Sequence, residues 1–349
     1  MMEASRLNVA IIGCGLIGAQ WDAEATSPAF SLTHAAGFSK NPRARLAAMC
    51  DKDADKARQA AERWGAQASY GDPRALFAGH KIDVAVVAAS SAARWEVIEP
   101  ALAAGVRVLV IEKPLATTLD ESLKFASAID AAGAKSIINF SRHWDPSMGA
   151  LRERIRANDM GALQRLIGTY GKGIINNGSH MIDLCAFLCD AKPVRARSLG
   201  SLLDAAEAGW SSGKDRALDA QVDFERKDGS RVQLTMLATD QSAFTCFELR
   251  LIGRKAICDI SKGGRSIAYT EIKDDPNYAG YRIPGEAVPQ PARALESMDC
   301  MVDEALRLAA GEIQKSSCDA HNALLTTLTV DAINRSAQGA GHWQEFFLP

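Results

Sequence analysis

The sequence contains no long hydrophobic run. Its apolar stretches, among them VAIIG, DVAVVAA and VRVLVI, have the length of strands and are interrupted by charged or turn residues. A membrane-spanning helix needs about 20 predominantly apolar residues, so we expect no membrane segment. The first residues, MMEASRLN, include an acid and lead directly into a strand, which is unlike a secretory signal peptide.

An excess of charge of one sign is also lacking. The chain has 40 Lys and Arg residues against 42 Asp and Glu residues, a net charge of −2, and no basic run stands out. We therefore expect no nucleic-acid and no membrane partner. The composition, 47% hydrophobic and 23% charged, is that of an ordinary soluble globular protein. A chain of 349 residues is too long for one typical core, so we expect two domains.

No pair of cysteines has the CxxC spacing of a zinc or redox motif. Cys185 and Cys189 are one helical turn apart, but no nearby thiol completes a zinc quartet. We expect no metal site, and we expect buried, reduced thiols, which fit a cytoplasmic protein. The eight cysteines are at positions 14, 50, 185, 189, 246, 258, 300 and 318.

The first 140 residues alternate short apolar strands with amphipathic helices. Strands that are apolar throughout and are each followed by a helix predict a parallel, doubly wound sheet, which binds ligands at the carboxyl ends of its strands. We expect residues 1–140 to form an NAD(P)-binding Rossmann domain. The expected strands are 7–12, 44–50, 83–89, 106–111 and 135–140, and the expected helices 54–64, 95–104 and 119–132.

Residues 141–349 show a different pattern and are expected to form a second, α+β domain. Period-two alternation predicts a large, mostly antiparallel sheet with one solvated or partner-covered face, and Asp228-Gly229 predicts a hairpin turn. The stretch 271–292 is expected to be a long loop that helps to define the substrate. The expected strands are 163–170, 194–203, 217–226, 230–239, 246–253 and 256–261, and the expected helices 148–158, 178–189, 293–310 and 318–337.

A glycine turn, GCGLIG, follows the first strand and precedes a predicted helix. In this GxGxxG pattern Gly13 allows a tight turn, Gly15 lets the backbone approach a pyrophosphate, and Gly18 permits close packing of helix on strand. Helix N-terminal N–H groups would meet the phosphate charge, so Leu16 and Ile17 join the expected cofactor site. The alternative is a purely structural glycine turn.

Asp51 ends the second strand, where an acid usually accepts hydrogen bonds from the adenosine ribose and favours NAD over NADP. It lies farther from the glycine turn than the usual distance of about 20 residues, because residues 21–34 (WDAEATSPAFSLTH) elaborate the first crossover. Asp51 could instead cap the following helix. Because the cation Lys52 is adjacent to Asp51, NADP stays an alternative to NAD.

Lys113, within Glu112-Lys113-Pro114, ends another parallel strand and should point into the cofactor crevice. Its ammonium could polarise a substrate oxygen and stabilise alkoxide charge. The alternative is a surface lysine paired with Glu112. Ser90 and Ser91 end the preceding strand and could contact the nicotinamide ribose or simply form a turn.

The segment 173–184 holds a polar cluster at the start of a helix. If it is helical, Asn176, His180 and Asp183 line one face, and Ser179 or Asn177 could cap it. Histidine titrates near neutrality and suits the removal or return of a hydroxyl proton. A lone histidine is more often structural, but the other motifs favour catalysis.

These motifs, in this order and spacing, resemble the glucose-fructose oxidoreductase / inositol dehydrogenase (Gfo/Idh/MocA) family over essentially the whole chain. The matching segments are GxGxxG, EKP, NFSRHWDP at 139–146 and GxHxxD at 178–183. The resemblance implies a Rossmann domain, a second domain with a large, mostly antiparallel open-faced sheet, and oxidation or reduction of a secondary alcohol of a sugar, cyclitol or sugar nucleotide with NAD(P). A homodimer or homotetramer is implied too, since the open sheet face often joins subunits in this family.

Carried over to this chain, the resemblance implies that Lys113 contacts nicotinamide ribose and substrate and that His180 is the acid/base. It also implies a cis bond before Pro114, a cofactor contact from Asn139 and a substrate contact from Arg142. The expected cofactor residues are Gly13, Gly15, Leu16, Ile17, Gly18, Asp51, Ser90, Glu112, Lys113 and Asn139, and the expected substrate residues are Asn176, Arg142 and Asp183.

Two positions depart from the family pattern. Asn176 stands where inositol dehydrogenases often have Asp, and an amide cannot take a proton, so a relay would use His180 and Lys113 alone. The family's threonine-proline…histidine is replaced by Ser90-Ser91…Trp95. We weigh an NAD(P)-dependent oxidoreductase against a non-catalytic NAD(P)- or sugar-sensing regulator of the same fold, and against a lyase with transient redox.

Overall fold

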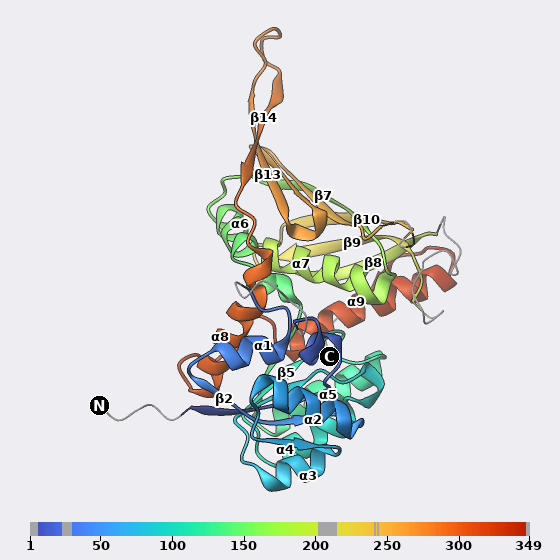
Figure 1. Ribbon diagram of the computed structural model, residues 1–349. Coiled ribbons are helices and arrows are strands. Elements are labelled where there is room, and N and C mark those ends of the chain that lie inside the picture. The colour runs from blue at the N-terminus through green and yellow to red at the C-terminus, as the bar shows by residue number, and fades with distance from the viewer. Residues whose placement is uncertain (1–5, 23–29, 202–214, 241, 243, 347–349) are drawn as a thin grey trace. The chain divides into compact units, whose positions relative to one another are not determined.

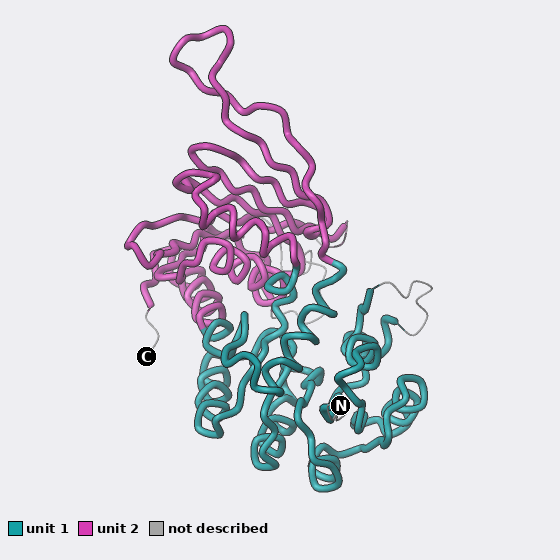
Figure 2. Tube along the Cα trace, turned by 90° about the vertical axis from the view of Figure 1, so that its left-hand side faces the viewer, with its two compact units in different colours: residues 1–145, 295–324 teal, residues 146–294, 325–349 magenta. Residues whose placement is uncertain are grey.

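The computed structural model describes residues 6–22, 30–201, 215–240, 242 and 244–346. The chain divides into two compact units (Figure 2), unit 1 with residues 1–145 and 295–324 and unit 2 with residues 146–294 and 325–349. This division differs from the expected one, which ran 1–140 and 141–349. Residues 295–324 join unit 1 because helix α8 (Ser297–Ala309) places Met301, Val302 and Leu306 in the core of that unit.

Unit 1 is built on a six-stranded parallel sheet with the order β3-β2-β1-β4-β5-β6. This order and direction are those of a doubly wound dinucleotide-binding fold, and the predicted Rossmann sheet is confirmed. The central strands are apolar throughout and are buried on both faces. The strands are β1 (Leu7–Ile12), β2 (Ala44–Cys50), β3 (Ala68–Tyr70), β4 (Val84–Val87), β5 (Val108–Ile111) and β6 (Lys135–Ile138).

Side-chain caps begin four helices of unit 1, α1, α2, α3 and α5. Thr33, Asp53, Asp72 and Thr118 each accept a backbone N–H from the first turn of their helix. The alternative in which Asp51 caps the second helix is therefore wrong, because Asp53 does so. The helices are α1 (His34–Lys40), α2 (Ala54–Trp64), α3 (Pro73–Gly79), α4 (Trp95–Ala103) and α5 (Leu119–Ala131), with α8 from the later segment.

Unit 2 is built on a nine-stranded sheet with the order β14-β13-β12-β11-β7-β10-β9-β8-β15. Among its described strands only β7 and β10 pair in parallel, so the predicted, mostly antiparallel sheet is confirmed. Helices α6 (Pro146–Arg156) and α7 (Ser179–Cys189) cover one face (Figure 1). The strands are β7 (Leu163–Tyr170), β8 (Ala191–Gly200), β9 (Asp219–Arg226), β10 (Arg231–Ala238), β11 (Phe247–Gly253), β12 (Ala256–Ser261), β13 (Ser266–Asp274), β14 (Arg282–Gln290) and β15 (Gln344–Glu345). Helix α9 (Ala320–Gln338) runs from unit 1 into unit 2.

The prediction of a loop over 271–292 is wrong. Strands β13 and β14 pair antiparallel and extend as a hairpin beyond the rest of their sheet (Figure 1). Almost every residue of β14 is exposed, so no alternation marks the strand. Its prolines, Pro284 and Pro289, are compatible with an edge strand, where fewer ladder donors are needed.

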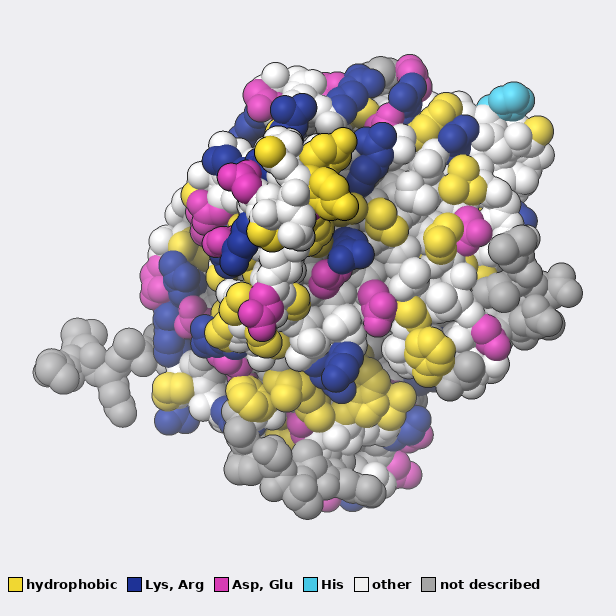
Figure 3. Space-filling view, turned by 90° about the horizontal axis from the view of Figure 1, so that it is seen from above, with side chains coloured by type: hydrophobic (Ala, Val, Ile, Leu, Met, Phe, Trp, Pro, Cys, Tyr) yellow, Lys and Arg dark blue, Asp and Glu magenta, His cyan; other side chains and the backbone are white. Residues whose placement is uncertain are grey.

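The surface shows charges of both signs. On the face drawn in Figure 3, Lys and Arg side chains are interspersed with Asp, Glu and apolar side chains. Among the described residues, no helix combines the length and the apolar character that crossing a membrane requires. All eight cysteines are free in this structure, and all but Cys300 are buried.

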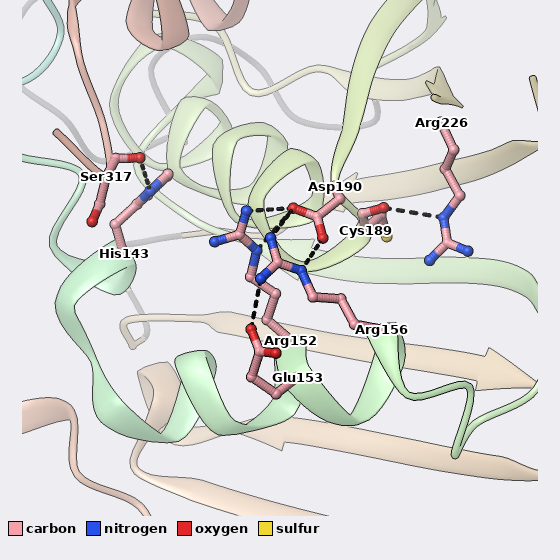
Figure 4. Close-up of polar contacts among 8 residues, drawn as sticks. All are labelled: His143, Arg152, Glu153, Arg156, Cys189, Asp190, Arg226 and Ser317. Carbon is pink, nitrogen blue, oxygen red and sulfur yellow. Dashed lines mark hydrogen bonds and ion pairs between the residues drawn. The ribbon is translucent and has the colours of Figure 1, made fainter. Parts of the chain in front are cut away.

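An ion-pair cluster anchors the end of α7 to α6 (Figure 4). Asp190, in the left-handed region at φ 48°, accepts hydrogen bonds from Arg152 and Arg156, with Nε of Arg152 at 3.0 Å. Burial opposes ionisation of Asp190, but the hydrogen bonds from Arg156 and Arg152 outweigh it and lower the pKa of the carboxyl. The cluster thereby fixes the helix that carries His180.

We expect Asp190→Asn to lower the free energy of unfolding by about 1 kcal/mol at pH 7, since Asn tolerates the same backbone but cannot ionise. Because the pKa of Asp190 is lower in the native than in the unfolded state, the ionised carboxylate stabilises the fold fully above the unfolded pKa of about 3.9, and this stabilisation is lost as pH falls through the native pKa. Urea unfolding at pH 7 and pH 4 should therefore show a smaller difference in unfolding free energy between wild type and Asp190→Asn at the lower pH. Glu153→Gln, at an exposed partner of Arg156, should cost less. An equal loss in both variants would contradict the assignment.

Candidate functional site

The three glycines of the turn after β1 have different surroundings. Gly13 has φ +103°, and a Cβ there would lie 2.5 Å from the carbonyl carbon of Ala88. A Cβ on Gly18 would lie 1.9 Å from the carbonyl oxygen of Gly13, whereas one on Gly15 would meet nothing within 4 Å. Packing therefore requires the first and third glycines, and the second faces open space.

The helix expected after the glycine turn is one π-helical turn, Leu16–Gln20. Leu16 is exposed and Ile17 is half-buried. The Asp22 carboxylate accepts hydrogen bonds from the backbone N–H groups of Leu32 and Thr33, which ties the start of the long crossover to the N-cap of α1. Part of the crossover, residues 23–29, lies outside the described residues.

A cavity of about 460 Å³ opens beside the glycine turn, at the carboxyl ends of β1, β2 and β4. Asp51 and Ser90 line this cavity together with Gly13 and Gly15. The Asp51 carboxylate accepts the backbone N–H of Cys14 at 2.8 Å, which fixes it against the turn. The charged lining side chains are Asp51, Asp72, Glu96 and Lys52. Three acids against one cation make this pocket unfavourable for an additional phosphate.

Glu112 follows β5 and is at the centre of a buried network. Its Oε1 accepts Nδ2 of Asn139 at 2.7 Å and lies 2.8 Å from Nε2 of His34, whose side chain is fully buried. Burial opposes ionisation, but hydrogen bonding to His34 and Asn139 and the charge of Arg94 lower the pKa of Glu112. Two expected cofactor residues, Glu112 and Asn139, are thus brought together. Sequence reasoning missed His34, and its place after a long insertion gave no signal.

Lys113 is half-buried in the turn after β5, and the Lys113–Pro114 bond is cis, as the resemblance implied. Arg94, which sequence reasoning also missed, contacts this turn. It is 3% exposed and donates to the carbonyl oxygens of Lys113 and Leu115 at 3.3 and 3.4 Å, and to that of Ala89 at 3.3 Å. Burial lowers the pKa of Arg94 to about 10, against the charge of Glu112.

Trp95, one of the departures from the family pattern, packs within unit 1. Its ring stacks on Phe125 of α5 with centroids 5.3 Å apart, and Nζ of Lys124 lies 3.7 Å over it. The side chain that reaches the turn of Lys113 is therefore that of its neighbour, Arg94. Arg142 lies in a 3-10 turn, Ser141–Trp144, after β6.

The remaining expected site residues belong to unit 2. Asn176 lies in a π-helical turn, Ile174–Gly178, that leads directly into α7, and His180 and Asp183 follow on α7. Asn176 and His180 are half-buried, whereas Asp183 is buried. Such π-helical turns occur frequently at functional sites.

The cap of this segment is not the one expected. Asp215 accepts the backbone N–H groups of Ile175 at 2.7 Å and Asn176 at 2.9 Å. Ser179 instead donates its hydroxyl to the carbonyl oxygen of Asn176. A Cβ on Gly173 would lie 2.4 Å from the Asp215 carboxyl carbon, so this close cap needs glycine at that position.

Residues 7–140 match the sequence model of an oxidoreductase family with an NAD-binding Rossmann fold. The chain is 28% identical to inositol 2-dehydrogenase 2 of Saccharopolyspora erythraea, over 54% of this chain and 56% of that protein. It is 26% identical to D-glucoside 3-dehydrogenase of Escherichia coli, over 54% of each chain. With D-apiose dehydrogenase of Paraburkholderia graminis it shares 26% identity over 45% of this chain and 38% of that protein. The matches span about half or less of these curated relatives.

Solved structures resemble the whole fold. An inositol dehydrogenase homologue from Azotobacter vinelandii, complexed with NADH and myo-inositol, has a TM-score of 0.76 at 18% identity over 98% of each chain. An NAD-binding oxidoreductase from Klebsiella pneumoniae has a TM-score of 0.75 at 20% identity, over 99% of this chain and 100% of that one. These likenesses confirm the predicted fold class.

A matched pair of glycine substitutions should separate cofactor approach from packing. Gly15→Ala adds a methyl group in open space, so the unfolding temperature should be unchanged while NADH affinity falls tenfold or more, about 1.4 kcal/mol. Gly18→Ala forces a backbone clash and should destabilise the protein by about 1–3 kcal/mol. Thermal unfolding and NADH fluorescence titration measure both. Wild-type NADH affinity in Gly15→Ala would contradict the assignment of the turn.

Proposed function

Since residues 7–140 belong to the Gfo/Idh/MocA family of oxidoreductases, we propose that the protein is an NAD-dependent oxidoreductase. Its reaction is hydride transfer between nicotinamide and a secondary alcohol or ketone of a sugar, cyclitol or sugar nucleotide. The observation that carries this proposal is the position of Lys113. It follows β5 at the same sheet edge as the cofactor cavity, in a turn held by Arg94 and adjacent to Glu112.

The residues of unit 1 fit a dinucleotide. The open space around Gly15 leaves its backbone free to approach a pyrophosphate, with the amides of Leu16 and Ile17 beside it. Asp51 would accept the adenosine ribose hydroxyls, and the acidic lining favours NAD over NADP. Ser90, Glu112 and Asn139 would complete the nicotinamide side. NAD, when bound, supplies the hydride acceptor or donor.

The proposed chemistry divides between a cation and a base. The Lys113 ammonium hydrogen-bonds the substrate oxygen and stabilises its developing alkoxide charge. His180 removes the hydroxyl proton during oxidation and returns it during reduction. Asn176 and Asp183 hold the substrate or orient His180, and Arg142 meets a carboxylate or phosphate of the substrate.

The named relatives support the substrate class. They are dehydrogenases whose names specify inositol, a D-glucoside and D-apiose, all polyhydroxylated compounds with alcohol groups that can be oxidised. This favours turnover over a role as a sensor. The free thiols suit a reducing compartment, and we place the protein in the cytoplasm.

Unit 2 is the proposed substrate-binding and oligomerisation domain. On the open face of its sheet, Ile167 of β7 and Leu237 of β10 are each 41% exposed, and Thr169 and Thr235 lie on the same face. Partly apolar sheet faces of this kind are favourable for association. We propose a homodimer or homotetramer that uses this face.

We expect Leu237→Asp to shift the protein towards the monomer, because a charge would be buried in the interface. Light scattering measures the mass, and circular dichroism checks that the fold is kept. Arg58→Asp, an exposed position on α2 of unit 1, is the control and should leave the mass unchanged. A wild-type protein that is monomeric would contradict the proposed assembly.

We expect Lys113→Ala and His180→Ala each to lower kcat by about 10²- to 10⁴-fold, since each removes a group that acts on the reacting oxygen or proton. NADH affinity should change less than kcat. The assay follows NADH formation with myo-inositol, D-apiose and an alkyl glucoside.

Matched controls are Lys124→Ala, at an exposed lysine over Trp95, and His321→Ala, at an exposed histidine paired with Asp130. Both should keep wild-type turnover. Near-wild-type turnover in both Lys113→Ala and His180→Ala would overturn the mechanism, and stoichiometric NADH binding without any turnover would instead favour a sensor.

A further inference from the structure

Arg94 is an unusual residue in the Rossmann unit because a guanidinium is almost fully buried there. Its side chain is 3% exposed, and charged side chains are rarely so buried unless they are paired or hydrogen-bonded. It directly precedes α4 and is not part of any motif that identified the fold. The desolvation of this cation calls for a compensating arrangement around it.

The compensation comes from backbone carbonyl groups of two separate loops. Nη2 and Nη1 donate to the carbonyl oxygens of Lys113 and Leu115, which flank Pro114, and Nε donates to that of Ala89 after β4. Ala89 also lines the cofactor cavity. One rigid side chain therefore joins a wall of the cofactor cavity to both sides of the lysine turn.

The geometry needs an arginine specifically. The guanidinium is planar and presents its donors in a fixed fork, so it can hold three carbonyl oxygens in one arrangement. A lysine ammonium is a compact point charge on a flexible stem and has no such preset directions. The fork fixes the backbone on which Lys113 is mounted, which limits where its ammonium can reach.

We propose that Arg94 is a positioning residue that sets the location of the Lys113 ammonium through the backbone of its turn. The inference rests on the proposed role of Lys113. A displacement of about 1 Å in a catalytic group can cost about 100-fold in rate. Arg94→Lys should therefore lower kcat by about 10- to 100-fold, while NADH affinity stays within about threefold, because the glycine turn and Asp51 are untouched.

The control is Arg74→Lys, at an exposed arginine of α3 that pairs with Glu99. It should leave kcat unchanged. Turnover is expressed per NADH-binding site, measured by fluorescence titration, so that loss of folded protein does not count as loss of rate. Arg94→Gln, which keeps a planar amide donor, is the second variant, and its kcat should also be lower than that of the wild type.

A double-mutant cycle distinguishes positioning from a general loss of structure. If Arg94 acts through Lys113, Arg94→Lys should have little further effect on the residual turnover of Lys113→Ala. Additive effects, or wild-type kcat in Arg94→Lys, would overturn the inference and leave the role of Lys113 intact. Wild-type turnover in Lys113→Ala would instead overturn the proposed mechanism itself.

Hydrogen exchange gives a readout that needs no substrate. Arg94→Lys should accelerate amide exchange across residues 112–118, whereas Arg74→Lys should not. Unchanged amide exchange across residues 112–118 in a folded Arg94→Lys variant would contradict the proposal that Arg94 holds the backbone of the Lys113 turn.

Discussion

The site of unit 1 depends on the burial of one negative charge. A buried carboxylate is stable only when it is hydrogen-bonded and faces positive charge, and Glu112 meets this requirement through His34, Asn139 and the nearby charge of Arg94. These partners come from α1, from the end of β6 and from the start of α4. The Glu112 carboxylate therefore interacts with residues of three segments at the end of β5, next to Lys113. Arg94 in turn donates to the carbonyl oxygens of Lys113 and of Ala89, which lines the cofactor cavity.

Unit 2 uses the same principle on both sides of His180, at the π-helical turn before α7 and at the end of α7. Asp215 accepts two N–H groups where the segment containing Asn176 begins, and Asp190 accepts the guanidinium groups of Arg152 and Arg156 where α7 ends. Backbone N–H groups at a helix start favour an anion, and a left-handed backbone position at a helix end accommodates Asp. The two carboxylates therefore stabilise the segment that carries His180 on either side of it.

Sequence patterns predicted the regular parts of the fold closely. The bounds of β1, β2, β7, β12 and α2 match to the residue, because uniform burial, period-two alternation or an amphipathic helix repeat is visible in each. The prediction failed over 271–292, where β14 is exposed on nearly all sides and carries two prolines. The element directly after the glycine turn also differs from the prediction, since it is one π-helical turn, Leu16–Gln20, and the regular helix α1 of this crossover begins only at His34.

The sequence by itself determined the dinucleotide turn and the two sheet types, because a glycine spacing and a hydrophobic period are local and have steric causes. It also located Lys113 and His180 as candidates through motifs a few residues long. Only the tertiary structure decided what holds them. His34 reaches Glu112 across 78 positions, Asp215 reaches Ile175 across 40, and Arg94 reaches Lys113 across 19. No short pattern encodes such contacts, since they exist only once separate strands and helices have packed together.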